Sequence, residues 1–218
     1  MKIILTDKYY VYNVHIDVTI VNIGATTMQK ILIINGHPGT NRLSSSMAEA
    51  YREAAQKSGH EVRVLNLREL NFDPILHEGY KIIQDLEPDL IRAQEMIKLS
   101  THLVLITPVW WGSVPALLKG FFDRVFLPGF AFKYKKDSPF WDRLLKGRTA
   151  RIIITSDGPT WWNRLIFGDP TVHMLKSSVL EFCGFRTKVT KLGNVKNYKE
   201  KDISKSLKKA AALGSRGI

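Results

Sequence analysis

The sequence contains a single cysteine, Cys183, and no long apolar segment. One cysteine cannot form an intramolecular disulfide, which favours a reducing compartment, so we expect the protein in the cytoplasm. No run approaches the roughly 18 uninterrupted apolar residues that indicate a membrane-spanning helix. The first 27 residues also differ from a secretory signal peptide, because charged residues interrupt their apolar stretches and no small-residue cleavage site follows.

Several common functional motifs are absent as well. The chain has no Gly-x-Gly-x-x-Gly fingerprint and no phosphate loop ending in Gly-Lys-Ser/Thr, which excludes the best-known nucleotide-binding motifs. It has no Gly-x-Ser-x-Gly nucleophile elbow. Its six histidines never pair with cysteine or acidic residues at zinc-site spacing, so we expect no metal.

Acidic residues are scarce relative to basic ones. The chain has 20 Asp and Glu residues against 32 Lys and Arg, which gives a formal net charge of +12. Ten of the basic residues but only two of the acidic ones lie at 186–218. This segment could attract nucleic acid, an anionic membrane surface or a phosphorylated cofactor. Because Tyr198 is its only aromatic residue, we favour a solvated lysine-rich helix face and expect no nucleic-acid partner; peripheral membrane contact stays an alternative.

Short β-branched apolar runs alternate with segments of helical spacing. The runs predict strands at 31–34, 61–65, 103–107, 151–155 and 186–192, and the second, which alternates with charged residues, is expected nearer an edge. Helices are expected from the capping box of Ser46 and Glu49, from about Pro88, from Ser113 as a cap, and at 172–182 and 199–213. The stretches 66–86 and 128–148 are expected to be loops.

Five strands that alternate with helices predict a parallel sheet covered by helices on both faces, a three-layer α/β/α fold. Ligands bind to such sheets beyond the carboxyl ends of the strands. The loops at 35–45, 107–114 and 155–170 are therefore the places to look for a site.

Two of these loops have unusual compositions. The first, Asn35–Ser46, combines glycines with a serine-rich helix start that suits a phosphate, although such a start is also an ordinary helix cap. The second carries Trp110 and Trp111 at the tip of a buried strand. A loop at this place is expected to be exposed to water, yet these two side chains have large apolar surfaces. A flat heteroaromatic ring stacked on them would give these side chains a partner.

The second loop continues as Thr107-Pro108-Val109-Trp110-Trp111-Gly112-Ser113-Val114-Pro115-Ala116-Leu117-Leu118-Lys119-Gly120-Phe121-Phe122-Asp123-Arg124-Val125. This stretch resembles the NAD(P)H dehydrogenase (quinone) family of flavodoxin-like flavoproteins. The likeness extends to five other places: His37, Phe72-Asp73-Pro74, Gly129-Phe130-Ala131-Phe132, Thr155-Ser156-Asp157-Gly158-Pro159 and Glu181-Phe182-Cys183-Gly184-Phe185. The likeness covers about residues 30–193. It implies a flavodoxin-like fold with strand order 2-1-3-4-5, bound FAD or FMN, NAD(P)H as electron donor, a quinone-like acceptor and a homodimer.

The resemblance also implies roles for individual residues. The flavin phosphate or pyrophosphate would lie beside His37, Leu43, Ser44 and Ser45. The isoalloxazine ring would lie against Pro108, Val109, Trp110 and Trp111 on one side and against Thr155, Ser156, Asp157 and Gly158 on the other. Phe132 and Tyr134 occupy positions that cover the site from the partner subunit.

The chain departs from the family where proton donors are expected. Trp161 and Phe167 stand where family quinone reductases place a tyrosine and a histidine that stabilise reduced flavin, and Asp157-Gly158 replaces the usual Gly-Gly. No catalytic residue is assigned; Trp161 and Asp157 are the candidates. Cys183 is expected to be a buried packing residue, and Asp123 with Arg124 an ordinary surface pair.

Three other functions stay open: a non-catalytic regulatory subunit of an ion-efflux system, a flavodoxin-type electron carrier, and a nucleic-acid binder that uses the C-terminal lysines. Carriers of this type are expected to be acidic, so the net charge argues against the second. Residues 1–27 have no pattern that joins the sheet, and we expect a dispensable extension ahead of a single flavin-binding domain at 28–218.

Overall fold

The computed structural model describes residues 27–218, so residues 1–26 of the expected extension lie outside the described part of the chain. Its centre is a five-stranded, all-parallel sheet in the order β2-β1-β3-β6-β7. The strands are β1 Lys30–Asn35, β2 Glu61–Asn66, β3 His102–Pro108, β6 Thr149–Thr155 and β7 Arg186–Leu192. Since these are the five predicted strands in the predicted order 2-1-3-4-5, the flavodoxin-like fold is confirmed.

Burial follows the sequence pattern of each strand. The apolar run 31–34 of β1 and the whole of β3 are buried, as strands covered on both faces must be. β2 alternates exposed and half-buried residues along most of its length and forms one edge of the sheet, which confirms the prediction for 61–65.

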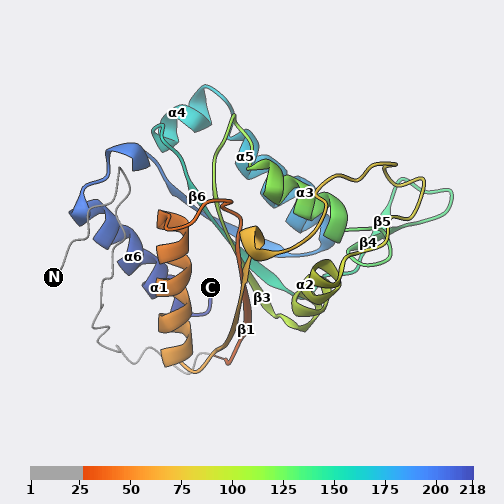
Figure 1. Ribbon diagram of the computed structural model, residues 1–218, viewed down its shortest axis with the longest axis horizontal. Helices are drawn as coiled ribbons and strands as arrows, with labels where there is room; N and C mark the ends of the chain where they lie inside the picture. The colour runs from red at the N-terminus through yellow and green to blue at the C-terminus, as the bar shows by residue number, and fades with distance from the viewer. Residues whose placement is uncertain (1–26) are drawn as a thin grey trace.

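Helices cover both faces of the sheet (Figure 1). On one face, α1 (Leu43–Lys57) and α6 (Glu200–Gly214) enclose a core that contains Ile31, Ile33, Met47, Tyr51 and Leu207. The two helices approach so closely that a Cβ atom on Gly214 would come within 2.3 Å of the Tyr51 carbonyl oxygen.

The other face is covered by α2 (Pro88–Leu99), α3 (Ala116–Val125) and a helical stretch made of α5 (Pro170–His173) and the π-helical η2 (Met174–Glu181). Their core contains Leu32, Ile34, Leu90, Phe121 and Leu180. Cys183 is buried in the same core, and burial raises the pKa of its thiol to about 12, consistent with the expected packing role.

Two helices begin away from their predicted caps. α1 begins at Leu43 because the amides of Ser45 and Ser46 both donate to the Arg42 carbonyl oxygen, so the Ser46 capping box is wrong. α3 begins at Ala116 after Pro115, and Ser113 is not its cap. The backbone of Ser113 instead exchanges two hydrogen bonds with that of Trp110, of 2.9 and 3.0 Å.

Two expected loops contain secondary structure. The stretch 128–148 holds an antiparallel hairpin of β4 (Phe132–Tyr134) and β5 (Trp141–Arg143). Trp141 anchors this hairpin by stacking on Phe182 at 4.3 Å and by donating its indole N–H to the Phe182 carbonyl oxygen at 2.8 Å. The short helices η1 (Leu67–Glu69), α4 (Thr160–Leu165) and η3 (Val195–Asn197) lie in other connections.

Arg124 is a buried structural residue rather than part of a surface pair. Its guanidinium has two bonds to the Glu87 carboxylate, of 2.9 and 3.2 Å, and also donates to the carbonyl oxygens of Asp73 and Asp85. Asp123 does take part in a surface ion pair, but its partner is Lys119 and not Arg124. Arg124 therefore fixes the long connection at 70–87 to α3 and the core.

Replacing Arg124 with methionine removes the guanidinium from these acceptors and leaves Glu87 only the Asp73 amide as a donor among the described residues. Loss of one partner of a buried ion pair costs about 3–5 kcal/mol. Because Glu87 is partly exposed, we expect Arg124→Met to lower the free energy of unfolding by about 3 kcal/mol, measured by urea denaturation. The matched control Lys119→Met removes the same charge from a surface pair and should cost less than about 1 kcal/mol. Equal losses in the two variants would contradict this role for Arg124.

Candidate functional site

Three loops meet at the carboxyl edge of the sheet, as predicted. Each loop starts with a backbone hydrogen bond to the neighbouring strand: Gly36 donates to Ile106 at 2.9 Å, Val109 to Thr155 at 2.8 Å and Ser156 to Leu192 at 2.9 Å. The residues that open each loop are therefore held in place by the sheet itself.

Asn35, at the end of β1, organises the first loop. Its buried side-chain amide nitrogen donates to Ser45 Oγ at 3.2 Å and to Asn66 Oδ1 at 3.3 Å, while its Oδ1 accepts from the His37 amide at 3.3 Å. These bonds join the strand, the loop and the first turn of α1. The start of α1 consequently lies at the carboxyl edge of the sheet.

The start of α1 also holds an unpaired buried group. The Oγ atom of Ser44 has no hydrogen-bond partner among the described residues, although Ser44 is only 3% exposed. A helix N-terminus attracts anions through its free amides and its dipole. Phosphate oxygens at this position would give the Ser44 hydroxyl a partner, so the residues present fit a phosphate group.

His37 lies between this helix start and the second loop. Its Nδ1 atom accepts a 2.8 Å hydrogen bond from the Gly39 amide, which places the ring proton on Nε2. Burial, together with the charge of Arg42, lowers the pKa of His37, so the ring is neutral at pH 7. The ring contacts Trp110 edge to face, with centroids 5.7 Å apart.

The second loop turns tightly at its two tryptophans. Trp111 and Gly112 have φ angles of +52° and +69°, and the Trp110–Ser113 backbone bonds close the turn. A positive φ is strained for a bulky side chain and is concentrated at functional sites. The indole of Trp111 is fully exposed, so the turn presents a large apolar surface with no cover from its own described chain.

The third loop is fixed by side-chain bonds. Ser156 Oγ donates to the Gly158 carbonyl oxygen at 2.9 Å and accepts from Asn163 at 3.1 Å. The turn orients the exposed Asp157 toward solvent.

A cavity of about 590 Å³ opens between the second loop, the third loop and the start of α5. Val109, Trp111, Ser156, Asn163 and Phe167 contribute to its lining. Lys191, paired with Asp169 at 2.5 Å, adds a charged group to the wall. Its size and largely apolar lining are typical of a small-molecule site.

The predicted site residues occupy the carboxyl edge in three groups. Leu43, Ser44 and Ser45 begin α1, and His37 contacts Trp110. Pro108 and Thr155 end neighbouring strands in register, while Val109, Trp111 and Ser156 line the cavity. Asp157 and Gly158 follow in the third loop.

The other predicted residues lie elsewhere. Trp161 is exposed on α4, edge to face with Trp162. On β4, Tyr134 is exposed, whereas Phe132 is buried against Phe182 in its own chain, with ring centroids 5.0 Å apart.

Sequence reasoning missed Asn35, Asn163 and the Lys191–Asp169 pair. Asn35 had a usable signal, because a polar residue that ends a buried apolar strand needs a hydrogen-bond partner. Asn163 bonds to Ser156 seven residues away within the third loop, and the Lys191–Asp169 pair joins two segments that are 22 residues apart. In the part of the chain that the structure describes, no three His, Cys, Asp or Glu side chains come together as metal ligands. Within the same part, no helix has the length and apolar character needed to cross a membrane.

Comparison with known proteins agrees with this geometry. Residues 29–213 match the family described as having a flavodoxin-like fold. Over 185 residues the chain is 30% identical to ribosyldihydronicotinamide dehydrogenase [quinone] of Mus musculus, covering 72% of this chain and 78% of that protein. It is 31% identical to NAD(P)H dehydrogenase [quinone] 1 of Cavia porcellus over 73% of this chain, but spans only 66% of that relative.

Among solved structures, Smu.1420 from Streptococcus mutans UA159 is similar with a TM-score of 0.73 and 29% identity, covering 87% of this chain and all of that one. An FMN-dependent NADH-azoreductase from Bacillus anthracis, solved with FMN, shares the fold with a TM-score of 0.67 at 19% identity, covering 86% of this chain and 98% of that one. The chain therefore belongs to the flavodoxin-like fold family that includes the NAD(P)H dehydrogenases (quinone).

Proposed function

We propose that this protein is a flavin-dependent NAD(P)H oxidoreductase that passes two electrons to a quinone or a similar small acceptor. The observation that carries the proposal is the position of the unpaired Ser44 hydroxyl, at a helix start on the same sheet edge as the exposed Trp111 turn and its cavity. A phosphate-bearing ligand with a flat aromatic ring suits both features. The relatives that share the fold include quinone dehydrogenases of the same family.

The first loop would hold the phosphate end of FMN, or the pyrophosphate of FAD. Ser44 and Ser45 offer hydroxyl groups and the first turn of α1 offers free amides. His37 would border the phosphate as a neutral donor through Nε2. The basic excess of the chain favours phosphorylated ligands in general, FMN, FAD and NADPH alike.

The second and third loops would hold the ring. Pro108, Val109, Trp110 and Trp111 offer apolar surface on one side, while Thr155, Ser156, Asp157 and Gly158 offer backbone and hydroxyl groups on the other. Flavin, when bound, supplies the hydride and electron transfer, and these residues orient it and exclude water.

Neither residue at the two positions where the family places a tyrosine and a histidine is a proton donor. The Trp161 indole can donate a hydrogen bond but cannot titrate near neutral pH, and the Phe167 ring has no polar atom. Asp157 is the one carboxylate among the predicted site residues. Trp161 and Asp157 therefore stay the candidates for catalysis. The same lack of a donor supports the alternative of a flavoprotein regulatory subunit without high quinone reductase activity.

A second copy of the chain would complete the site. Trp111, Tyr134, Phe140, Trp161 and Phe167 are all large aromatic side chains that are more than half exposed. Covering them in a homodimer would remove this apolar surface from water. In that arrangement the Tyr134 side chain of one subunit would close the cavity of the other. Phe132 would hold the Tyr134 ring in place, because the two rings of one chain are in edge-to-face contact with centroids 5.1 Å apart. A cytoplasmic location suits this activity and the single buried thiol.

The proposal predicts a yellow protein. The purified chain, or the chain incubated with FMN or FAD, should show flavin absorbance, and NADH or NADPH should bleach it without oxygen. Adding a soluble quinone should restore the colour within the mixing time if the protein is a reductase. Bleaching with slow reoxidation by quinone points to the regulatory alternative, whereas a colourless protein that takes up neither flavin would refute the proposal.

The stacking role of Trp111 has its own test. Stacking of an aromatic ring on a flat heterocycle is worth about 1–3 kcal/mol. We expect Trp111→Ala to weaken flavin binding by that amount, measured as the dissociation constant from flavin fluorescence quenching. Trp162→Ala is the matched control, because this exposed indole lies on α4 and is not part of the cavity lining. Unchanged affinity in Trp111→Ala would mean that this side chain faces something other than the flavin.

A further inference from the structure

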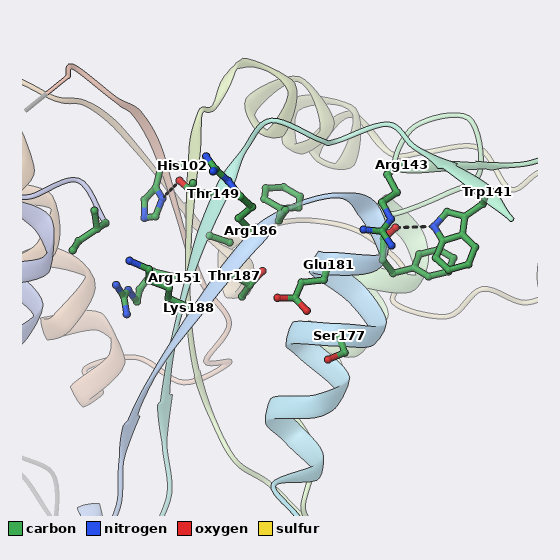
Figure 2. A pocket seen from close by; sticks show the side chains of 14 residues that line it. His102, Trp141, Arg143, Thr149, Arg151, Ser177, Glu181, Arg186, Thr187 and Lys188 are labelled. Carbon is green, nitrogen blue, oxygen red and sulfur yellow. Dashed lines mark hydrogen bonds between the residues drawn. The ribbon is translucent and has the colours of Figure 1, made fainter.

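A second cavity, of about 780 Å³, lies at the starting ends of β6 and β7, opposite the carboxyl edge (Figure 2). β6 is seven residues long, and a strand rises about 3.3 Å per residue, so the two edges are roughly 20 Å apart. The cavity bends around the outer edge of β7, which has no strand partner among the described residues. It is therefore separate from the proposed flavin site.

Basic side chains gather on one face of the sheet in this cavity. Arg151 of β6 lies directly opposite Lys188 of β7, and Thr149 lies opposite Arg186. Residues two apart on a strand share a face, so all four side chains project to the face covered by α1 and α6. Two like charges placed directly opposite each other destabilise a sheet, and no carboxylate of the described residues lies within ion-pair distance of Arg151, Arg186 or Lys188.

Arg151 is the central residue of this group. It is 92% buried, and no carboxylate of the described residues lies within ion-pair distance of its guanidinium. Among the described residues its one hydrogen bond is long, 3.4 Å to Thr190 Oγ1, and its Nε atom has no partner there. Burial is the main cause that lowers the pKa of Arg151; Tyr51 acts in the opposite direction, and the charge of Arg216 lowers the pKa further.

His102 adds a second unpaired polar atom to the same face. The side chain is 98% buried, and its Nδ1 lies 2.7 Å from Thr149 Oγ1, but its Nε2 has no partner. Burial and the charge of Arg151 lower the pKa of His102 to about 4, so the ring is neutral at pH 7 and offers a hydrogen bond rather than a charge.

The one acidic side chain among the described residues that line the cavity lies on the other face, while the C-terminal residue Ile218 lies on the basic face. Glu181 lines the far part of the cavity, on the same side as Trp141 (Figure 2). Its carboxylate is 3.8 Å from the Lys176 ammonium group. It does not neutralise the basic face, because β7 stands between them. The cavity therefore has a cationic half, with three basic side chains and no acidic side chain among the described residues, and a more apolar half beside it.

We propose that the cationic half binds a small oxyanion, a phosphate or carboxylate group of a metabolite, through Arg151, Arg186 and Lys188. A buried guanidinium without a counterion gains a charge-assisted bond when an oxyanion enters, and the planar fork of arginine fits either group. The outward amides of β7 supply further donors, as does His102 Nε2 in the tautomer in which the Thr149 hydroxyl donates to Nδ1. The aromatic half would accept an apolar part of the same ligand.

Calorimetric titration of the full chain tests this site. Inorganic phosphate and succinate are used as separate probes, each against sodium chloride at equal ionic strength. The protein is first saturated with FMN, and Ser44→Ala is titrated in parallel, so that phosphate bound at the start of α1 is recognised. We expect one ion per chain for at least one probe, with the better probe indicating which oxyanion the ligand carries.

Variants assign the binding to this cavity. Arg151→Met should weaken the better probe by at least tenfold, and Lys188→Met, an exposed position, should do the same by several-fold even if Arg151→Met fails to fold. Arg63→Met on β2 removes the same charge from the opposite edge of the sheet and should leave affinity unchanged, as should Ser44→Ala. The proposal is overturned if neither phosphate nor succinate binds, or if chloride displaces the probe to the same extent from the parent and from every variant. It is also overturned if Lys188→Met binds the better probe with the parent's affinity.

Discussion

The parallel alignment of β1, β3 and β6 is the constraint on which the rest of the structure depends. These strands are buried on both faces, so their backbone hydrogen bonds and apolar side chains form the most stable part of the domain. Parallel strands bring all their carboxyl ends to one edge, and there the chain must leave the sheet in loops. The start of α1, the Trp110–Trp111 turn and the Ser156 loop consequently lie side by side, although about 120 residues separate the first from the last.

The rigid sheet also explains how strained and unpaired groups persist at this edge. Trp111 keeps a positive φ and a fully exposed indole because the backbone on either side is fixed by bonds to Ser113 and Thr155. Ser44 keeps an unpaired hydroxyl because Asn35 holds the first turn of α1 in place through Ser45. Both groups gain a partner if a phosphate-bearing aromatic ligand binds, which is why they support one function together.

The sequence was sufficient for the sheet and for the three loops that meet at its carboxyl edge. β-branched runs such as that at 31–34 identify buried strands without any tertiary information, and the strand order then determines which loops meet. Features that depend on distant partners were missed or misplaced. Arg124 is paired with Glu87, 37 residues away, and nothing local distinguishes it from a surface arginine. The hairpin of β4 and β5 has only three residues per strand, too few for an alternating pattern, and it depends on Trp141 stacking on Phe182. α1 begins before Ser46 because Asn35 holds Ser45, a contact between a strand end and a helix start that capping rules do not include.

The basic residues that give the net charge of +12 include two groups in different environments. Four of the eight lysines at 186–218 lie exposed on α6, where water screens them, whereas Arg151 is enclosed at the start of β6 with no carboxylate of the described residues within ion-pair distance. Only the enclosed charge requires a ligand to explain it, so the basic composition by itself says little about function.

The central claim is that the start of α1 receives a flavin phosphate, and the affinities of FMN and riboflavin test it most directly. The two ligands share the ring and differ in the phosphate, so their ratio isolates the contribution of the helix start. Two charge-assisted hydrogen bonds are worth about 3 kcal/mol, which corresponds to FMN binding about 100-fold more tightly than riboflavin in fluorescence titrations at equal ionic strength. Equal affinities for the two ligands would contradict the account.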